Sequence, residues 1–257
     1  METEPIIQVK HLVAGYNEDI ILQNVSFDVY ENEIFIILGG SGCGKTTLLR
    51  HLVGLNRPLS GQIFIDGEDI ASGNGVALDH ILKKIGILYQ TSALFGSMTI
   101  QENIALPLFE YTGLTANSVY DMVRMKLCVV GLSGYEDHLP SEISGGMKKR
   151  AGLARALALN PKILFLDEPT AGLDPPTSAE IDELILHINK ALGTTIVIVT
   201  HELDSIFTVA KRIIMLDKET KGIIAEGDPR ILKDKSENTT VRQFFNRKAQ
   251  ITKEMDR

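Results

Sequence analysis

The sequence of 257 residues predicts an α/β fold around a parallel β-sheet, on three grounds. Residues 34–38 form the continuous apolar run IFIIL, which is typical of a strand buried on both faces of a sheet that helices cover. A glycine-rich segment follows this run and leads into a helical pattern. After residue 160 the patterns alternate between strand and helix, which indicates parallel strands joined by right-handed crossovers.

The first third of the chain is predicted to be rich in strands, because β-branched and aromatic residues gather between turn residues. The predicted strands cover residues 6–12, 20–30, 33–38 and 62–65, with turns at Gly15, Glu31-Asn32, Ser60-Gly61 and Asp66-Gly67. A helix is predicted over residues 46–55, since Gly54 lies at its end and Pro58 follows.

The middle of the chain, from about Thr91 to Asn160, is predicted to be helical. Apolar residues at helical spacing predict a helix over residues 118–130, and a composition rich in Ala, Leu, Lys and Arg predicts another over 144–159. The last third is predicted to contain strands over residues 162–167, 194–200, 212–216 and 222–226, and helices over 177–192 and 203–210.

The tail after Lys233 is polar and charged, except for an apolar group at residues 241–245. Two alternatives remain open for this group. It docks on a sister subunit or a regulatory partner, or it belongs to a frayed C-terminus.

Composition and charge exclude several classes of protein. Hydrophobic residues make up 44% of the chain, which argues against a disordered or fibrous protein. The formal net charge of −7 argues against a broad basic surface for nucleic acid. The two cysteines, Cys43 and Cys128, lie far apart, so we expect neither a disulfide framework nor a structural zinc site. We expect no signal peptide and no membrane span, because the apolar stretches are short.

Residues 39–47 fit the pattern GxxxxGK[ST] of a phosphate-binding loop. The glycines let successive backbone N–H groups converge on phosphate oxygens, and the helix that follows directs its positive end at the same anion. Lys45 is expected to reach the β- and γ-phosphates, and Thr46 to offer its hydroxyl to Mg²⁺. The residues of this loop are Gly39, Gly40, Ser41, Gly42, Cys43, Gly44, Lys45, Thr46 and Thr47.

Two carboxylates, Asp167 and Glu168, follow the apolar strand predicted to end at residue 167. Side chains in this place face the crevice in which α/β sheets bind ligands. Asp167 is expected to hold Mg²⁺ through water, and Glu168 to orient and polarise the attacking water. His201 follows another apolar strand and is expected to be catalytic. Gln90 either ends its apolar stretch as an ordinary polar residue or reaches the metal and the attacking water.

A second anion-binding pattern, Ser144-Gly145-Gly146-Met147, begins a predicted helix. With these motifs in this order, the chain from about Ile6 to Asp228 resembles the ATP-binding cassette (ABC) family. The resemblance implies one P-loop NTPase domain over residues 1–238 and a C-terminal extension over 239–257. Its core, residues 1–90 and 161–238, would hold the parallel sheet and an N-terminal antiparallel β subdomain, with a helical subdomain inserted at 91–160.

The resemblance also implies roles for single residues. Tyr16 is similar to the aromatic residue that stacks on adenine. The implied catalytic residues are Glu168, His201 and Lys45, and the implied Mg²⁺ ligands are Thr46, Gln90 and Asp167. The implied ATP-binding residues are Tyr16, Gly39, Gly40, Ser41, Gly42, Cys43, Gly44, Lys45, Thr46, Thr47, Gln90 and Asp167. The residues implied to bind the ATP of the opposite subunit are Ser144, Gly145, Gly146, Met147 and Asp174.

One departure from the usual signature, Leu-Ser-Gly-Gly-Gln, is informative: Ile143 and Met147 replace its first and last residues. Methionine here, with the stretches at 94–99 and 102–108, resembles the ATPases of the Mla and Mkl type, which serve phospholipid transport with MCE proteins. This implies an ATP-hydrolysing homodimer, peripheral on the cytoplasmic face of the inner membrane. Its partners would be a permease, an MCE-type lipid-binding protein and a small regulatory subunit, without nucleic acid.

Two other functions remain open. The same cassette could serve an importer or exporter of polar solutes such as amino acids or metal ions. A soluble mechanoenzyme of DNA repair or the ribosome is disfavoured by the short insertion between Gln90 and Ser144, the single cassette and the acidic charge.

Overall fold

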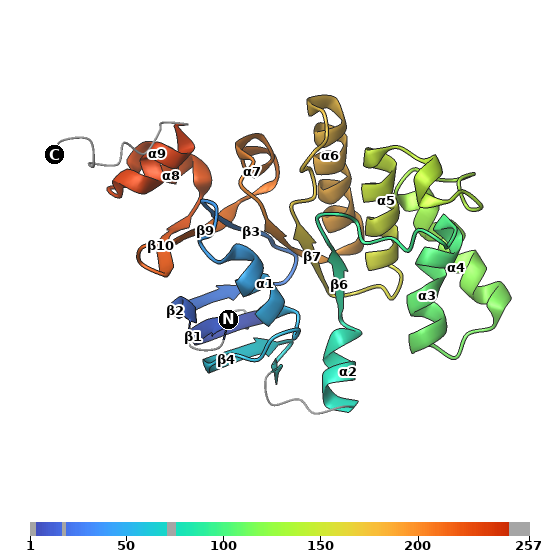
Figure 1. The fold of residues 1–257 in the computed structure, drawn as a ribbon, viewed down its shortest axis with the longest axis horizontal. Coiled ribbons are helices and arrows are strands. Elements are labelled where there is room, and N and C mark those ends of the chain that lie inside the picture. The colour runs from blue at the N-terminus through green and yellow to red at the C-terminus, as the bar shows by residue number, and fades with distance from the viewer. Residues whose placement is uncertain (1–3, 17–18, 71–75, 247–257) are drawn as a thin grey trace.

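The computed structural model describes residues 4–16, 19–70 and 76–246, which form two β-sheets with helices packed around them (Figure 1). The central sheet contains β3 (Ile34–Gly39), β6 (Ile85–Leu88), β7 (Ile163–Asp167), β8 (Thr195–Val199), β9 (Arg212–Asp217) and β10 (Gly222–Gly227). Its order is β10-β9-β3-β8-β7-β6, and every neighbouring pair except β9 with β10 is parallel. The second sheet is antiparallel and contains β1 (Ile7–Tyr16), β2 (Asp19–Val29), β4 (Ser60–Ile65) and β5 (Glu68–Asp69). The predicted fold class is confirmed.

Helices cover both faces and one end of the central sheet (Figure 1). α1 (Lys45–Leu52) packs between the two sheets. The opposite face carries α6 (Pro175–Leu192) and α7 (Leu203–Val209). Beyond β6 and β7 lie α3 (Ile100–Tyr111), α4 (Ala116–Val129), the short 3₁₀ helix η1 (Pro140–Glu142) and α5 (Gly145–Ala156).

The pleat of β3 explains why the sheet is buried on both faces. Ile34, Ile36 and Leu38 point into the larger hydrophobic cluster, which the helices beyond the sheet complete. Phe35 and Ile37 point the other way, into the cluster shared with α1 and the antiparallel sheet. Successive side chains of a strand alternate between faces, so an unbroken apolar run contributes side chains to both hydrophobic clusters.

Among the described residues, four α-helices were not predicted from the sequence patterns, namely α2 (Val76–Leu82), α3, α8 (Pro229–Lys235) and α9 (Thr239–Phe245). Pro107 lies inside α3 and lacks a backbone N–H, which obscures the helical pattern. A capping box at the start of α3 was the available signal: Glu102 N donates to Thr99 Oγ1 at 3.2 Å, and Thr99 N donates to Glu102 Oε2 at 2.7 Å.

Some predicted boundaries were wrong. β1 runs through Gly15, where we predicted a turn, to Tyr16. The strand accommodates its length through register shifts and a left-handed residue at His11, with φ of 48°. The helices predicted over 46–55, 118–130 and 144–159 correspond to α1, α4 and α5, each of which ends earlier than predicted.

The chain continues after β10 into α8 (Pro229–Lys235) and α9 (Thr239–Phe245). Val241 and Phe245 of α9 are buried in the larger cluster of their own chain, and the Phe245 ring centroid lies 5.7 Å from that of Phe207 in α7. Of the two alternatives left open for this apolar group, the frayed C-terminus is therefore wrong, and these two side chains pack within their own chain. Residues 247–257 of the expected extension lie outside the described residues.

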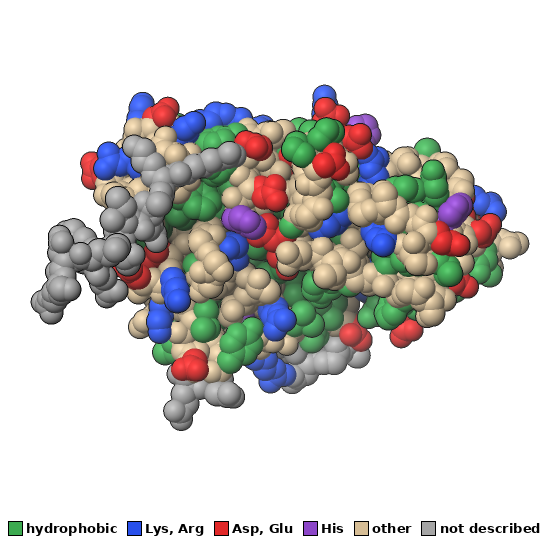
Figure 2. All heavy atoms as spheres, turned by 45° about the horizontal axis from the view of Figure 1, so that its top comes forward, with side chains coloured by type: hydrophobic (Ala, Val, Ile, Leu, Met, Phe, Trp, Pro, Cys, Tyr) green, Lys and Arg blue, Asp and Glu red, His purple; other side chains and the backbone are tan. Residues whose placement is uncertain are grey.

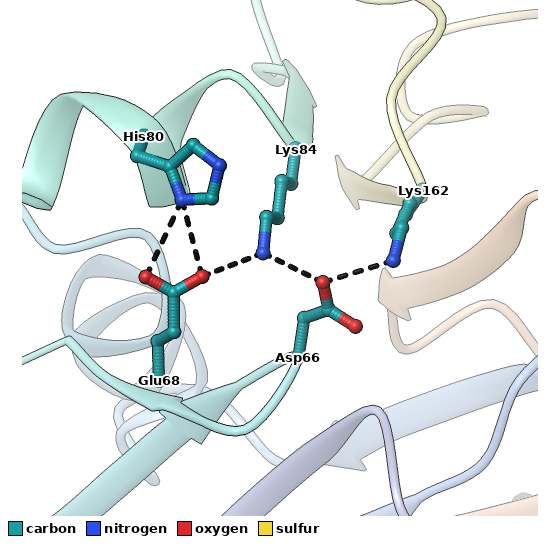
Figure 3. Close-up of polar contacts among 5 residues, drawn as sticks. All are labelled: Asp66, Glu68, His80, Lys84 and Lys162. Atoms are coloured by element: carbon teal, nitrogen blue, oxygen red, sulfur yellow. Dashed lines mark hydrogen bonds and ion pairs between the residues drawn. The ribbon is translucent and has the colours of Figure 1, made fainter.

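A network of charged side chains joins the two sheets on the side of α2 (Figure 3). Lys84, just before β6, contacts Asp66 and Glu68, each at 2.6 Å, and Lys162, just before β7, contacts Asp66 at 2.9 Å. His80 of α2 approaches Glu68 at 3.1 Å. Burial alone would raise the pKa of Asp66, but the hydrogen bonds from Lys84 and Lys162 outweigh it and hold that pKa below its ordinary value. The network therefore fixes the β4–β5 turn against the starts of two central strands.

One buried carboxyl, Asp182, lies between α6 and α7. It is 4% exposed, and its Oδ1 atom has no hydrogen-bond partner among the described residues. Burial raises the pKa of Asp182 to about 6; a hydrogen bond with Ser205 opposes the rise, and the charge of Glu202 adds to it. Because this pKa lies above the unfolded value of about 4, the carboxyl contributes stability at low pH that is lost as pH rises through about 6.

We predict that Asp182→Asn gains stability over the wild type as the pH rises. The amide keeps the shape of the carboxyl but cannot ionise. Between pH 4.5 and 7.5, the difference in free energy of unfolding should move in favour of the variant by about 1–3 kcal/mol. Urea unfolding at the two pH values measures it. Asp121→Asn, at an exposed site, is the control; equal pH trends for both variants would contradict the prediction.

Candidate functional site

The carboxyl ends of four adjacent strands form the candidate site. The strands lie in the order β3, β8, β7, β6 and run parallel, so the segments that follow them meet at one edge of the sheet. The loop at residues 39–47 follows β3, Glu168 follows β7, His201 follows β8 and Gln90 follows β6. The structure thus brings together residues that the sequence motifs selected separately.

The phosphate-binding loop ends in α1 without a side-chain cap. Gly44 is the N-cap, with φ of 100°, and no side chain accepts a hydrogen bond from the first turn. The first N–H groups of a helix lack partners within the helix, so here they are left for an anion. Gly39 has room for no side chain, because a Cβ atom would overlap the carbonyl oxygen of Leu216. Lys45 Nζ donates to Gly39 O at 2.8 Å and to Gly40 O at 3.2 Å, which folds its ammonium over the loop.

Glu168 is held in place at its backbone and at its carboxylate. Its φ of 47° is left-handed, which is unfavourable for a residue with a Cβ atom and persists only where surrounding contacts impose it. Glu168 N donates to Val199 O at 2.8 Å. The Thr200 hydroxyl donates to Oε2 at 3.1 Å, and His201 Nδ1 lies 2.7 Å from Oε1. A carboxylate fixed in this way can orient a water molecule and accept a proton from it.

Asp167 and Glu168 are two consecutive acidic residues, and both are buried. Both are 8% exposed. Burial raises the pKa of Asp167, and so does the charge of Glu168, whereas Lys149 and Lys45 oppose the rise. A cation beside Asp167 would relieve this cost.

Oxygen ligands of the kind Mg²⁺ prefers are present at this edge, namely the Asp167 carboxylate, the Thr46 hydroxyl and the Gln90 amide oxygen. Within the described ranges, no cluster of three His, Cys, Asp or Glu residues could hold a metal by itself. Mg²⁺ is commonly bound by one or two carboxylates together with substrate phosphates.

The second anion-binding pattern lies at the start of α5. Ser144 Oγ accepts a hydrogen bond from Met147 N at 3.2 Å, so Ser144 is the N-cap. Asp174 caps the neighbouring helix α6 by accepting from Thr177 N at 3.4 Å, and it also accepts from the Thr177 hydroxyl at 2.7 Å. A Cβ atom on Gly146 would lie 2.5 Å from Thr177 Cγ2, so this glycine is required for α5 to approach α6. Met147 is half-buried and packs on the larger cluster.

Tyr16 lies at the end of β1 and is 42% exposed. Its hydroxyl accepts a hydrogen bond from Arg50 Nη1 at 3.5 Å. The ring is therefore open to a planar ligand beside α1.

Two residues that contact Glu168, Thr200 and Lys149, were not predicted from the sequence. The sequence pattern could have identified Thr200, because it precedes His201 at the end of an apolar strand. No sequence pattern identifies Lys149.

Comparison with known proteins identifies the family. Residues 22–171 match the family model described as ABC transporter. The chain belongs to the ABC transporter family of ATPases. The predicted resemblance is therefore confirmed.

Three curated relatives carry different transport names. The probable ribonucleotide transport ATP-binding protein Mkl of Mycobacterium leprae is 43% identical over 93% of this chain and 68% of the relative. The methionine import ATP-binding protein MetN of Geobacillus kaustophilus is 44% identical over 86% of this chain and 64% of the relative. The intermembrane phospholipid transport system ATP-binding protein MlaF of Haemophilus influenzae is 38% identical over 86% of this chain and 83% of the relative. This ABC chain spans about two thirds of the length of the Mkl proteins.

Solved structures share the fold. The ATP-binding cassette MJ0796, a dimer in a post-hydrolysis state bound to ADP and Pi, has a TM-score of 0.78 and 31% identity, over 86% of this chain and 98% of that one. CbiO1 from Clostridium perfringens, part of the ABC transporter complex cbiONQ, has a TM-score of 0.80 and 30% identity, over 88% of this chain and 90% of that one.

The surface of this ABC chain carries both signs of charge. On the face drawn in Figure 2, Lys and Arg side chains lie in small groups among Asp and Glu. Within the part of the chain that the structure describes, no helix is both long enough and apolar enough to span a membrane.

We predict that Gly146→Ala destabilises the fold. The added methyl group meets Thr177, whose hydroxyl is fixed by Asp174, so α5 and α6 must separate. The expected loss is about 1–3 kcal/mol in the free energy of unfolding, measured by urea denaturation. Gly145→Ala is the matched control, because its Cβ would meet Leu173 at an ordinary 3.6 Å. Equal stability of the two variants would contradict this explanation.

Proposed function

We propose that this chain is the ATP-binding and ATP-hydrolysing subunit of a membrane transporter that moves phospholipid or another hydrophobic substrate. The observation that carries the ATPase proposal is the carboxylate of Glu168, which Thr200 and His201 hold at the same sheet edge as the phosphate-binding loop. The proposed division of the chain is a core at residues 1–90 and 161–238, a helical subdomain at 91–160 and an extension at 239–257.

ATP binding uses the backbone donors of the phosphate-binding loop together with Lys45 and Tyr16. The N–H groups of the loop at residues 39–47 and of the first turn of α1 bind the phosphate oxygens. Lys45 adds a positive charge at the β- and γ-phosphates, and the ring of Tyr16 stacks on adenine. When bound, Mg²⁺ would be held by Asp167, Thr46 and Gln90 and would neutralise charge on the phosphate oxygens.

Hydrolysis requires one water molecule in line with the γ-phosphate. Glu168 orients this water and attracts its proton while the water oxygen bonds to the γ-phosphorus. The bond between the γ-phosphorus and the bridging oxygen breaks, which leaves ADP and phosphate. His201 holds the Glu168 carboxylate through Nδ1, so its Nε2 atom remains for the γ-phosphate.

A homodimer completes each site. Ser144, Gly145, Gly146, Met147 and Asp174 lie at the starts of α5 and α6, and no hydrogen bond among the described residues joins them to the phosphate loop of their own chain. In a head-to-tail dimer, these helix ends bind the γ-phosphate held by the other subunit. ATP then closes the dimer, and hydrolysis lets it open.

A hollow beside the helical subdomain provides the surface for a permease. It has a volume of about 680 Å³ and is lined mainly by apolar side chains from the segment after α1, the end of α2, β6, α3 and α5. Leu55, Phe95 and Tyr111 at this hollow are 59%, 51% and 43% exposed. Large exposed apolar groups around a hollow are typical of a protein interface. The hollow adjoins the segment after Gln90, so a permease there senses the nucleotide site from the cytoplasmic face of the inner membrane.

The substrate proposal is supported by the likeness to MlaF, whose name specifies phospholipid, and by Met147 in the signature. An MCE-type lipid-binding protein and a small regulatory subunit are the further partners we propose. The likeness to MetN favours a second candidate, a transporter of polar solutes such as amino acids. Purification of the membrane complex, followed by mass spectrometry of co-purified lipid, tests the choice. Stoichiometric phospholipid supports the first proposal, and a complex free of lipid that binds an amino acid supports the second.

We predict that Glu168→Gln retains ATP binding and stops turnover. Glutamine keeps the shape of the side chain but accepts a proton poorly, so kcat should fall about 10²–10⁴-fold. A phosphate-release assay measures turnover, and size-exclusion chromatography with ATP should show a persistent dimer. Glu183→Gln, an exposed change on α6, is the control. Undiminished hydrolysis by Glu168→Gln would overturn the assignment of the base.

We predict that Phe95→Glu weakens attachment to the permease without changing the hydrolysis of ATP by the isolated chain. A carboxylate in an apolar interface costs about 1–3 kcal/mol, which corresponds to a loss of about 5- to 150-fold in affinity. Recovery of the chain with detergent-solubilised membranes measures it. Ile231→Glu in α8 is the control, because Ile231 is 56% exposed and lies outside the hollow. Equal recovery of the two variants would remove the hollow as the docking surface.

A further inference from the structure

A buried lysine on α5, Lys149, connects the helical subdomain with two points of the catalytic edge. Its Nζ atom donates to Gln90 O at 2.6 Å and to Glu168 O at 2.9 Å. Gln90 follows β6 and Glu168 follows β7, so one ammonium group holds the ends of two neighbouring strands. Lys149 lies in the second turn of α5, just after the residues at 144–147.

The environment of Lys149 is unusual for a lysine. The residue is 5% exposed, and burial lowers the pKa of its ammonium, although the charges of Asp167, Glu168 and Glu202 oppose this. Within the described residues, Nζ forms no ion pair with a carboxylate, and its hydrogen bonds go to the two backbone carbonyls. Burying a charge is unfavourable, and here two charge-assisted hydrogen bonds offset this cost. These bonds also fix the positions of two segments of main chain.

Glu168 needs this support because its own backbone is strained. Its left-handed φ of 47° persists only while its neighbours hold it. Val199 holds its N–H, and Thr200 and His201 hold its carboxylate. These three contacts come from the central sheet and the loop after β8. Lys149 is the contact that comes from the helical subdomain.

The segment after Gln90 is attached to the same helix. Arg155 of α5 donates to Ser92 O at 2.9 Å and to Ala93 O at 2.7 Å. Ser92 and Ala93 are both left-handed, with φ of 61° and 46°, so this loop is strained as well. A Cβ atom on Gly152 would lie 3.2 Å from Ser92 Cβ, which shows how closely α5 approaches the loop. α5 and the loop are therefore joined at three carbonyls, and Lys149 extends the connection to Glu168.

We propose that Lys149 is a positioning residue for ATP hydrolysis, which ties the loop after Gln90 and the main chain of Glu168 to α5. A displacement of that loop or of α5 then moves the carboxylate that orients the water. This rests on the proposed function, because it concerns the same Glu168. It adds that the geometry of the base is set partly from the helical subdomain.

The test compares Lys149→Met and Lys149→Arg with the wild type in the full-length chain. Methionine fills a similar volume but donates no hydrogen bond, so the Glu168 carbonyl keeps its bond from Ala171 N at 3.2 Å and loses its link to α5. We expect kcat to fall about tenfold, with the KM for ATP changed less than about twofold, since the phosphate loop is untouched. Arginine keeps the charge and the donors, and kcat should recover to within about threefold of the wild type.

The control is Lys148→Met, which removes the same charge from the adjacent position of α5 and should leave kcat and KM unchanged. If Lys149→Met does not fold, as shown by its unfolding temperature, Lys149→Gln takes its place. The expected result is the same, a fall in kcat with little change in the KM for ATP. A kcat of Lys149→Met within twofold of the wild-type value would overturn the role of Lys149. A kcat of Lys149→Arg as low as that of Lys149→Met would also overturn it. These outcomes differ from failure of the proposed function, in which the wild type itself would not hydrolyse ATP.

Discussion

Burial of the central sheet on both faces is the constraint on which the rest of the structure depends. Because β3, β7 and β8 are fully enclosed, their backbone groups are satisfied by neighbouring strands, and polar side chains are admitted only where the strands end. The neighbouring strands β3, β8, β7 and β6 are parallel, so these ends lie at one edge. The phosphate loop, the two carboxylates and His201 therefore share a crevice although the chain separates them widely. Nucleotide chemistry at this edge is a consequence of sheet topology as much as of the residues themselves.

How far the sequence could predict this structure depends on the range of the forces involved. The run at residues 34–38 and the loop at 39–47 were predictable because burial, periodicity and glycine geometry act over a few residues. α3 was missed because Pro107 interrupts its pattern, although Thr99 and Glu102 gave a local signal. The contacts of Lys149 could not be predicted, since they join α5 to carbonyls 59 and 19 residues away. Periodicity indicates which face of α5 is buried, but not that a lysine on this face meets two strand ends.

Several residues chosen for nucleotide binding also have structural roles within their own chain. Ser144 and Asp174 cap α5 and α6, and Gly146 allows these helices to approach. A loss of activity on mutating them would therefore combine two effects, the loss of a helix cap and the loss of an anion ligand. Lys45 differs, because its bonds reach only carbonyls of its own loop. Activity lost at Lys45 reports more directly on phosphate binding.

The arrangement of α5 explains why one helix can serve both the dimer and the catalytic base. Lys149, Gly152 and Ala156 recur at helical spacing and form the face that packs against β6 and the loop after Gln90. Gly86 of β6 meets this face at Ala156, where a side chain would overlap the helix backbone. A helix fitted this closely cannot shift without moving the loop, because packed interiors transmit displacement rather than absorb it. Ser144 at its start belongs to the proposed dimer contact, and Arg155 near its end holds the loop beside the proposed permease surface. The stiffness of α5 would thus provide a physical connection between these two proposed surfaces and the carboxylate of Glu168.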